Sequence, residues 1–370
     1  MDSTHFKYGF RMSHNDDFKC HSTRRRVRMN NIKVVGIDLA KNIIQIHGND
    51  KKGKCVLRKR LSREKLVEFM AQLPSCLIGI EACGGAHHWA RTFQVMGHTV
   101  KIMAPQFVKP YVKSNKTDRN DAEAIAEAVI RPNMRFVPVK TIEQQDTLLI
   151  HRARELVIKQ KTAQANQIRG FLAEYGIVIA KGIQNLEKIA MIIDDNKEKL
   201  SIKAQGILEQ LCKQFKAFDA EMEHYDKQIA QVIKENAMCQ SLLKIEGVGP
   251  ITASAIVATI GDAKAFKNGR EVSVWLGLVP KQHSSGNTVR LGSITKRGDR
   301  YIRRLLVHGA RSAIKVAGNK KDRRNTWITD KKERLGYNKA AVALANKNAR
   351  IIWAMLATGE SYRQQGLLAA

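Results

Sequence analysis

The sequence lacks the segments that membrane and secreted proteins carry. Its longest apolar runs, such as CLIGI at residues 76–80, are far too short to cross a bilayer, and the polar N-terminus has no apolar signal core. The six cysteines form no CxxC pair and no other spacing typical of a zinc site. We therefore expect no membrane association, reduced thiols and a cytoplasmic location.

Acidic residues are also scarce. Asp and Glu total 34 against 64 Lys and Arg, so the formal net charge is +30. An excess of this size indicates a polyanionic partner, because cations that neutralise a phosphate backbone release its counterions. Solubility alone is the weaker explanation. With 370 residues, 44% of them hydrophobic, the chain can form two or three folded domains.

Residues 32–104 alternate between β-branched runs and amphipathic segments. The runs at 32–38, 43–48 and 54–61 predict three strands joined by hairpin turns. After them the sequence predicts a helix at 62–73 with Ser62 as N-cap, a strand at 76–81, a helix at 86–97 and a strand at 98–104. This order predicts an α/β domain with an RNase H-like sheet. A sugar-kinase or actin-like ATPase also opens with a strand ending on Asp, but its further glycine-rich phosphate loops are absent from the sequence.

Four carboxylates are predicted to lie at the carboxyl ends of the strands, where open α/β sheets bind their ligands. Asp38 and Glu81 end two predicted strands, and Asp118 and Asp121 share one face at the start of a predicted helix. Such a cluster repels itself unless a hard cation lies inside it, and oxygen ligands suit Mg²⁺, with Mn²⁺ as a substitute. Taken singly, each residue also fits a turn, a cap or a helix-dipole role. As a set in a basic protein, they predict a metal site for phosphoryl transfer.

From residue 141 the pattern becomes helical. The segment 141–175 contains no proline, and its cations face either solvent or a nucleic-acid backbone. We assign nucleic-acid contacts to Arg152, Arg154, Lys159, Lys161 and Arg169.

A second helical segment carries an apolar seam with spacings of three and four residues, typical of a coiled coil. The seam packs either on the first long helix, as an intramolecular hairpin, or on another subunit. We favour a coiled coil that also dimerises. The seam consists of Leu208, Leu211, Phe215, Phe218, Met222, Tyr225, Ile229 and Val232.

Two turns in the last third of the chain have a chemical interpretation. The GVG turn with Gly247 and Gly249 is typical of a helix-hairpin-helix motif, whose amides bind a DNA phosphate; a plain interhelical turn is the alternative. The sequence Ser284, Ser285, Gly286 indicates, on chemistry alone, only a turn.

Three motifs, VVGIDLAK, IGIEACGG and NKTDRNDAEAIAEA, resemble those of the DEDD transposases of bacterial insertion sequences, the insertion-sequence one-ten family. The resemblance extends over about residues 32–358 and includes the segment VWLGLVPKQHSSGNTVR. It implies a RuvC-like domain whose metal ligands are Asp38, Glu81, Asp118 and Asp121.

The resemblance also implies a C-terminal domain in which a serine just before glycine attacks DNA. This assigns the nucleophile to Ser285, with Ser284 the less favoured neighbour. His283 could act as its base, although the metal is the better activator. The basic residues that follow are expected to contact phosphates: Lys296, Arg297, Arg300, Arg303, Arg304 and Arg311.

Partners follow from the same resemblance. A noncoding bridge (guide) RNA is expected to select donor and target DNA by base pairing. Protomers are expected to share active sites, so that a homodimer assembles to a tetramer, in a bacterial cytoplasm close to the nucleoid.

The sequence thus predicts an RNA-guided site-specific recombinase, or transposase, with a covalent phosphoserine intermediate. The alternatives are a metal-dependent endonuclease like the Holliday-junction resolvases, or a non-catalytic nucleic-acid-binding scaffold. The predicted segments are a disordered basic arm at 1–30 (or an extension before a start at Met29), a RuvC-like DEDD domain at 31–140, long helices and a coiled coil at 141–237, a C-terminal transposase domain at 238–358, and a tail at 359–370.

Overall fold

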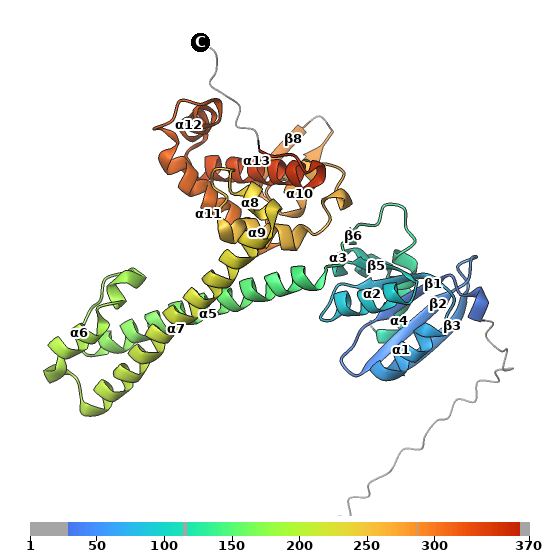
Figure 1. Ribbon diagram of the computed structural model, residues 1–370, viewed down its shortest axis with the longest axis horizontal. Helices are drawn as coiled ribbons and strands as arrows, with labels where there is room; N and C mark the ends of the chain where they lie inside the picture. The colour runs from blue at the N-terminus through green and yellow to red at the C-terminus, as the bar shows by residue number, and fades with distance from the viewer. Residues whose placement is uncertain (1–28, 114–116, 287, 363–370) are drawn as a thin grey trace, which may run out of the picture. The chain divides into compact units, whose positions relative to one another are not determined.

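The computed structural model describes residues 29–113, 117–286 and 288–362 (Figure 1). Nearly all of the basic arm predicted at 1–30 and most of the tail predicted at 359–370 lie outside these residues. The chain divides into two compact units between Arg135 and Phe136, close to the boundary predicted after residue 140. Within the described residues, no helix is long and apolar enough to span a membrane.

The first unit is built on a mixed sheet in which five strands have the order β3-β2-β1-β4-β5. The strands β1 (Val34–Asp38), β2 (Ile43–Asn49) and β3 (Cys55–Ser62) pair antiparallel, whereas β4 (Leu77–Glu81) and β5 (Thr99–Met103) continue from β1 in parallel. The short β6 (Phe136–Val137) begins the second unit. The five predicted strands are confirmed to within two residues at each end, and so is the mixed α/β class of this region.

Among its described residues, the first unit has four helices. They are α1 (Arg63–Ala71), α2 (Ala86–Val95), α3 (Pro105–Val108) and α4 (Asp118–Ala128), with 3-10 turns at Met29–Asn31 and Lys109–Tyr111. Helices α1, α2 and α4 pack on the sheet, and α3 packs on α4. Ser62 caps α1 as predicted, because its side chain accepts a hydrogen bond from the amide of Lys65. Thr117 caps α4 in the same way through the amide of Asn120. Helix α4 lies against β1, β2 and β4.

Two glycines allow α4 to lie very close to the sheet. Gly36 of β1 and Gly79 of β4 are neighbours in the parallel register. A Cβ atom on Gly36 would lie 2.5 Å from the amide nitrogen of Ala126 and closer still to the carbonyl oxygen of Ala122. Both of these atoms belong to the backbone of α4. A larger residue in β1 would therefore push the whole helix away from the strand, since a backbone cannot rotate aside as a side chain can.

The second unit begins with two long helices that form an antiparallel hairpin (Figure 1). Helices α5 (Ile142–Glu174) and α7 (Ile202–Glu235) are connected through α6 (Ile189–Asp195) and 3-10 turns at Ile183–Leu186 and Lys197–Lys199. All eight residues of the predicted seam on α7 are buried or half-buried. The seam thus packs within the chain, and its role in dimerisation stays a prediction.

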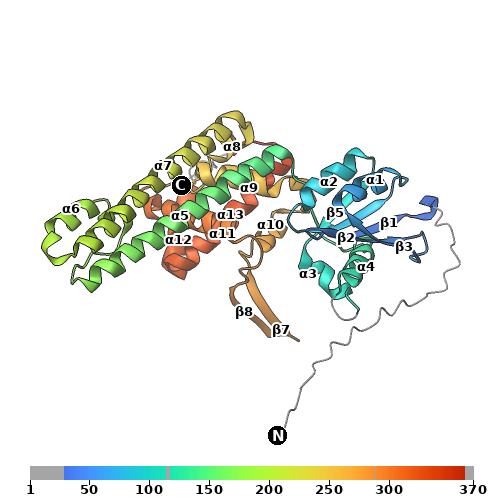
Figure 2. The same cartoon turned by 90° about the horizontal axis from the view of Figure 1, so that it is seen from below.

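The rest of the second unit is mainly helical and surrounds one apolar core to which every helix contributes. A two-stranded hairpin of β7 (Pro280–Ser285) and β8 (Thr288–Ile294) extends away from this core, and nearly all of its residues are exposed (Figure 2). The helices are α8 (Ala237–Leu242), α9 (Pro250–Ile260), α10 (Gly269–Trp275), α11 (Arg300–Ala317), α12 (Arg323–Leu335) and α13 (Tyr337–Thr358), with a 3-10 turn at Ala263–Ala265.

A buried histidine links α5 to two helices of this core. His151 is 1% exposed, and its Nε2 lies 3.0 Å from the hydroxyl of Ser254 while its Nδ1 lies 3.1 Å from the hydroxyl of Tyr301. The Ser254 hydroxyl donates to the carbonyl of Pro250 and so accepts from Nε2. This arrangement suits a neutral imidazole that accepts from Tyr301. Burial, together with the charge of Arg154, lowers the pKa of His151 to about 4.

The glycine contact gives a first prediction. Gly36→Ala should destabilise the first unit by about 3 kcal/mol and displace α4, since the added methyl group meets helix backbone. The control is Gly206→Ala in α7, where a Cβ meets no atom within 4 Å. This change should stabilise its helix by about 0.5–1 kcal/mol. Urea denaturation measures both, and equal effects of the two substitutions would contradict the close contact.

The buried histidine gives a second prediction. The pKa of His151 is about 4 in the folded protein against 6.5 when unfolded, so the unfolded chain binds the extra proton between these values. Its contribution to the free energy of unfolding is present above pH 6.5 and is lost as pH falls toward 4, by up to about 3 kcal/mol. His151→Gln should flatten the stability profile in this window. Identical slopes for the variant and the wild type, from denaturation at several pH values, would refute this role.

Candidate functional site

Strand alternation directs two carboxylates toward the face of the sheet that α4 covers. Asp38 follows Gly36 by two residues and Glu81 follows Gly79 by two residues. Side chains two apart on a strand point to the same face, so both carboxylates share the face of the glycines that contact α4. Ile37 pairs with Ile80 in the parallel register, which makes Asp38 and Glu81 neighbours at the carboxyl ends of β1 and β4.

The first turn of α4 brings the other two carboxylates to this edge. One ligand oxygen from each of Asp38, Asp118 and Asp121 lies within 4.8 Å of the others. Glu81 is outside this tightest group. The pKa of the Cys83 thiol is raised, first by burial and then by the negative charges of Asp38 and Glu81. Both carboxylates are therefore close enough to act on the same sulfur atom. The structure thus gathers three of the predicted ligands closely and places the fourth on the neighbouring strand.

The donor set defines which ion fits. Three carboxylate oxygens this close repel one another, and a divalent cation with oxygen preference relieves that repulsion. Asp118 is exposed, while Asp38 and Asp121 are half-buried, so an ion held here would keep open positions toward solvent or substrate.

The lining of a hollow beside Asp118 includes two arginines, Arg60 and Arg119, that are not among the predicted site residues. Arg60 is paired with Gln45, which is paired with Asp38, so the three form one row across β3, β2 and β1. Arg119, next to Asp118 in the chain, lines the same hollow. The register of the predicted hairpin is the sequence signal that indicates Arg60, because it places this residue in the row of Asp38.

The predicted nucleophile lies at the end of a strand rather than in an open loop. Ser285 is the last residue of β7 and pairs with Thr288, and His283 pairs with Arg290. Alternation places these four side chains on one face of the hairpin, where they line one hollow that Ser284 also borders. Ser284 pairs with Val289, on the opposite face.

Three of the five cations predicted on the first long helix bind other parts of the protein. Arg152 is exposed, and so is Lys159, which forms an ion pair with Glu155 of its own helix (3.5 Å). The bound groups are Arg154 with Asp226 (2.7 Å), Lys161 with Asp219, and Arg169 with the carbonyl oxygen of Gly182 (2.6 Å). For these three, the structure gives a role in holding the helical hairpin together.

The cations after the serine divide in the same way. Lys296, Arg297 and Arg300 are exposed. The other three have partners within the protein: Arg303 donates to the carbonyl of Leu276 (2.9 Å), Arg304 pairs with Glu155 (3.0 Å), and Arg311 donates to Asn338 (2.8 Å).

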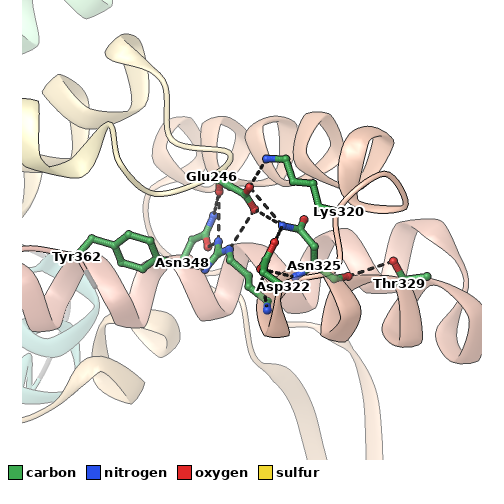
Figure 3. Close-up of polar contacts among 8 residues, drawn as sticks. Glu246, Lys320, Asp322, Asn325, Thr329, Asn348 and Tyr362 are labelled. Carbon is green, nitrogen blue, oxygen red and sulfur yellow. Dashed lines mark hydrogen bonds and ion pairs between the residues drawn. The ribbon is translucent and has the colours of Figure 1, made fainter. Parts of the chain in front are cut away.

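The GVG turn is held by a polar network, drawn in Figure 3. The Glu246 carboxylate pairs with Lys320 and accepts from the buried Asn325, while its carbonyl accepts from the buried Asn348 (3.0 Å). Gly247 has φ +83°, and a Cβ there would lie 2.7 Å from a carbonyl oxygen of α11. This turn therefore connects α8 and α9 and packs against α11. Its role in DNA binding stays a prediction, as does that of Gly249.

Comparison with known proteins matches two family models to the chain. Residues 35–177, which contain the four carboxylates, match a transposase model of the DEDD type, and residues 239–325, which contain both serines, match the model described as Transposase IS116/IS110/IS902 family. The chain is 44% identical over 335 residues to a probable family 20 transposase of Pseudomonas aeruginosa, covering 90% of this chain and 99% of that protein.

Two further relatives are transposases of named insertion elements. The chain is 44% identical over 341 residues to the transposase for insertion sequence element IS1111A of Coxiella burnetii, covering 92% of this chain and 94% of the relative. It is 38% identical over 331 residues to the transposase for insertion sequence element IS1328 of Yersinia enterocolitica, covering 90% and 98% respectively.

The acidic cluster gives a third prediction. Asp118→Asn should weaken Mn²⁺ binding at least about tenfold, because it removes one ligand charge. Without metal the variant should be as stable as the wild type or slightly more so, since the exposed Asp118 contributes repulsion and no core packing. Titration calorimetry and thermal melting measure the two effects. The control is Glu68→Gln on the exposed face of α1, and equal Mn²⁺ affinity in all three proteins would exclude the site.

Proposed function

The chain belongs to the IS116/IS110/IS902 family of transposases, and we propose that it recombines DNA for an insertion element through a metal site and a nucleophilic serine. A transposase cuts DNA and rejoins it. The observation that carries the proposal is the convergence of Asp38, Asp118 and Asp121 at one edge of an α/β sheet, inside the segment that matches DEDD transposases.

In this proposal Asp38, Glu81, Asp118 and Asp121 hold Mg²⁺, for which Mn²⁺ can substitute. The DEDD family implies a divalent metal, and a donor set made only of carboxylates fits a hard cation. A bound cation would stabilise negative charge on the phosphate under attack. The order of three antiparallel strands followed by two parallel ones supports the RNase H-like, RuvC-like assignment of this unit.

Ser285 is the proposed nucleophile. Its Oγ forms a bond to phosphorus while the bond from phosphorus to the neighbouring deoxyribose oxygen breaks, and that oxygen leaves as a hydroxyl after taking a proton from water. A metal held by the carboxylates would be the better activator of the Ser285 hydroxyl, and His283, which shares its face of the hairpin, is the alternative base that could accept the proton. Attack by a DNA hydroxyl on the phosphoserine then joins the strand and releases the serine.

Guide RNA and a dimer that assembles to a tetramer complete the proposal. Their support is the resemblance to the one-ten family and the net charge of +30. The exposed cations suited to backbone contacts are Arg152, Lys159, Lys296, Arg297 and Arg300. The N-terminus of α9, which follows Gly249, is suited to a phosphate.

An endonuclease like the Holliday-junction resolvases is the alternative, because the acidic cluster lies entirely within the first unit. Such an enzyme would cut with metal and water, and no protein would become attached to the DNA. A non-catalytic scaffold is not supported, since the family cuts and rejoins DNA.

The fourth prediction separates these mechanisms. Ser285→Ala should abolish a covalent protein-DNA adduct while leaving DNA binding intact, because it removes one hydroxyl from an exposed hairpin. Ser284→Ala is the matched control and should reduce adduct formation only slightly, since its side chain points to the other face. Labelled DNA trapped with Mg²⁺ and mapped by mass spectrometry measures the adduct. Cleavage without any adduct would favour the resolvase mechanism, and an adduct on another residue would exclude Ser285.

A further inference from the structure

The hollow beside the acidic cluster has a volume of about 610 Å³ and is lined mainly by strands β2 and β3 and the start of α4. Its lining combines several cationic side chains with Asp118, one of the proposed metal ligands. The side chains that matter here are Gln45, His47, Arg58, Arg60, Arg119 and Asp118.

The strand register connects the hollow to the cluster. Asp38, Gln45 and Arg60 lie directly opposite one another on three adjacent strands, so their side chains share one face. Adjacent strands are about 4.8 Å apart, so the Cα atom of Arg60 lies roughly 10 Å from that of Asp38. From this distance the side chain of Arg60 can contact a ligand that lies beside the acidic cluster, but it does not enter the cluster itself.

Two of the four cations around the hollow are already neutralised or shielded. Arg58 donates to Glu123 at 3.0 Å, and Lys59 lies over the ring of Phe69 at 4.4 Å. His47 is 3% exposed, its Nε2 is hydrogen-bonded to Asn49, and its Nδ1 has no hydrogen-bond partner among the described residues. Burial lowers the pKa of His47, which favours a neutral ring.

Arg60 and Arg119 differ from these residues. Both are exposed, and neither forms an ion pair or side-chain hydrogen bond with another described residue, the cluster carboxylates included. Two uncompensated guanidinium groups thus border an acidic cluster that would otherwise repel a polyanion. A guanidinium fork matches the oxygens of a phosphate, and such contacts fix the register of a strand.

We propose that this hollow binds a backbone phosphate of the DNA strand being cut, next to the phosphate at the acidic cluster, with Arg60 and Arg119 as its ligands. The assignment rests on the proposed function, because it takes the acidic cluster as the place of cutting. Gln45, between Asp38 and Arg60, can donate to the same strand from its side-chain amide. The contact would hold the scissile phosphate at the metal ligands while the neighbouring phosphate is neutralised.

The test is a chemical double-mutant cycle. Neutral methylphosphonate linkages are placed one at a time on either side of the cut, and single-turnover cleavage is measured with the full chain and its nucleic acids. For the wild type, one linkage near the cut should slow cleavage about 10- to 100-fold. In Arg60→Ala and Arg119→Ala the same linkage should have almost no further effect, because its partner is already missing. Arg60→Lys should recover part of the loss, since it keeps the charge without the fork.

Lys52→Ala is the control. It removes one exposed positive charge from the turn of the same β2–β3 hairpin, at the end far from Asp38, and its effect should simply add to that of the neutral linkage. Mn²⁺ affinity should be unchanged in the arginine variants, because neither residue is a ligand. Additive effects for both arginines at every linkage would overturn the proposal.

Two further arms separate the causes of failure. First, the same combinations of variants and neutral linkages are compared by their DNA affinity, which does not depend on cleavage. If the acidic cluster is not the place of cutting, the arginines can still show coupling to a phosphate in this measurement. Methylphosphonate linkages are also placed in the guide RNA. Coupling of Arg60 to an RNA phosphate in place of a DNA phosphate would overturn the proposal in favour of RNA in the hollow.

Discussion

The close approach of α4 to β1 is the constraint on which the acidic site depends. Gly36 allows the helix backbone to contact the strand backbone, and Gly79 continues this clearance on the neighbouring strand. Asp38 is two residues beyond Gly36, and Asp118 begins the helix that the glycine admits. The spacing of the carboxylates is therefore set by backbone packing, which is far stiffer than side-chain rotation. The same packing allows Arg119, the next residue of the helix, to line the hollow beside the cluster.

The distribution of charge explains why net charge alone is a poor guide to a binding surface. Arg154 and Lys161 on α5 lie opposite acids on α7, and together they align the two helices of the hairpin. Such cations stabilise the fold and are not available to a phosphate without losing a partner. What distinguishes Arg60 and Arg119 is the lack of such a partner in the described part of the chain, next to a site that must accept a polyanion.

The sequence predicted the first unit well because its elements are encoded locally. β-branched runs, the Ser62 cap, the carboxylates at two strand ends and the acidic pair in the first turn of a helix are all short-range signals. They sufficed to predict the four residues of the candidate site. What the sequence could not supply were partners far apart in the chain. Lys161 reads as a solvent-exposed cation until Asp219 is known to lie beside it. Gly247 reads as a phosphate-binding turn, whereas its φ of +83° and its contact with α11 already account for a glycine. The GVG turn is also held by Glu246, whose partners Asn325 and Asn348 lie far along the chain.

Strand alternation decides which residues act together in both proposed centres. In β1, Asp38 points to the same face of the sheet as Gly36. In β7, Ser285 and His283 point to one face of the hairpin, and Ser284 points to the opposite face. A slip of one residue in either pairing would turn the reactive side chain to the wrong face. In β1 the packing of α4 prevents such a slip. The residues of β7 and β8 are nearly all exposed, so among the described residues the register of this hairpin rests on its own cross-strand pairs and on Gly286, which has a φ of +53°. The conformation of that glycine is therefore as important for Ser285 as Gly36 is for Asp38.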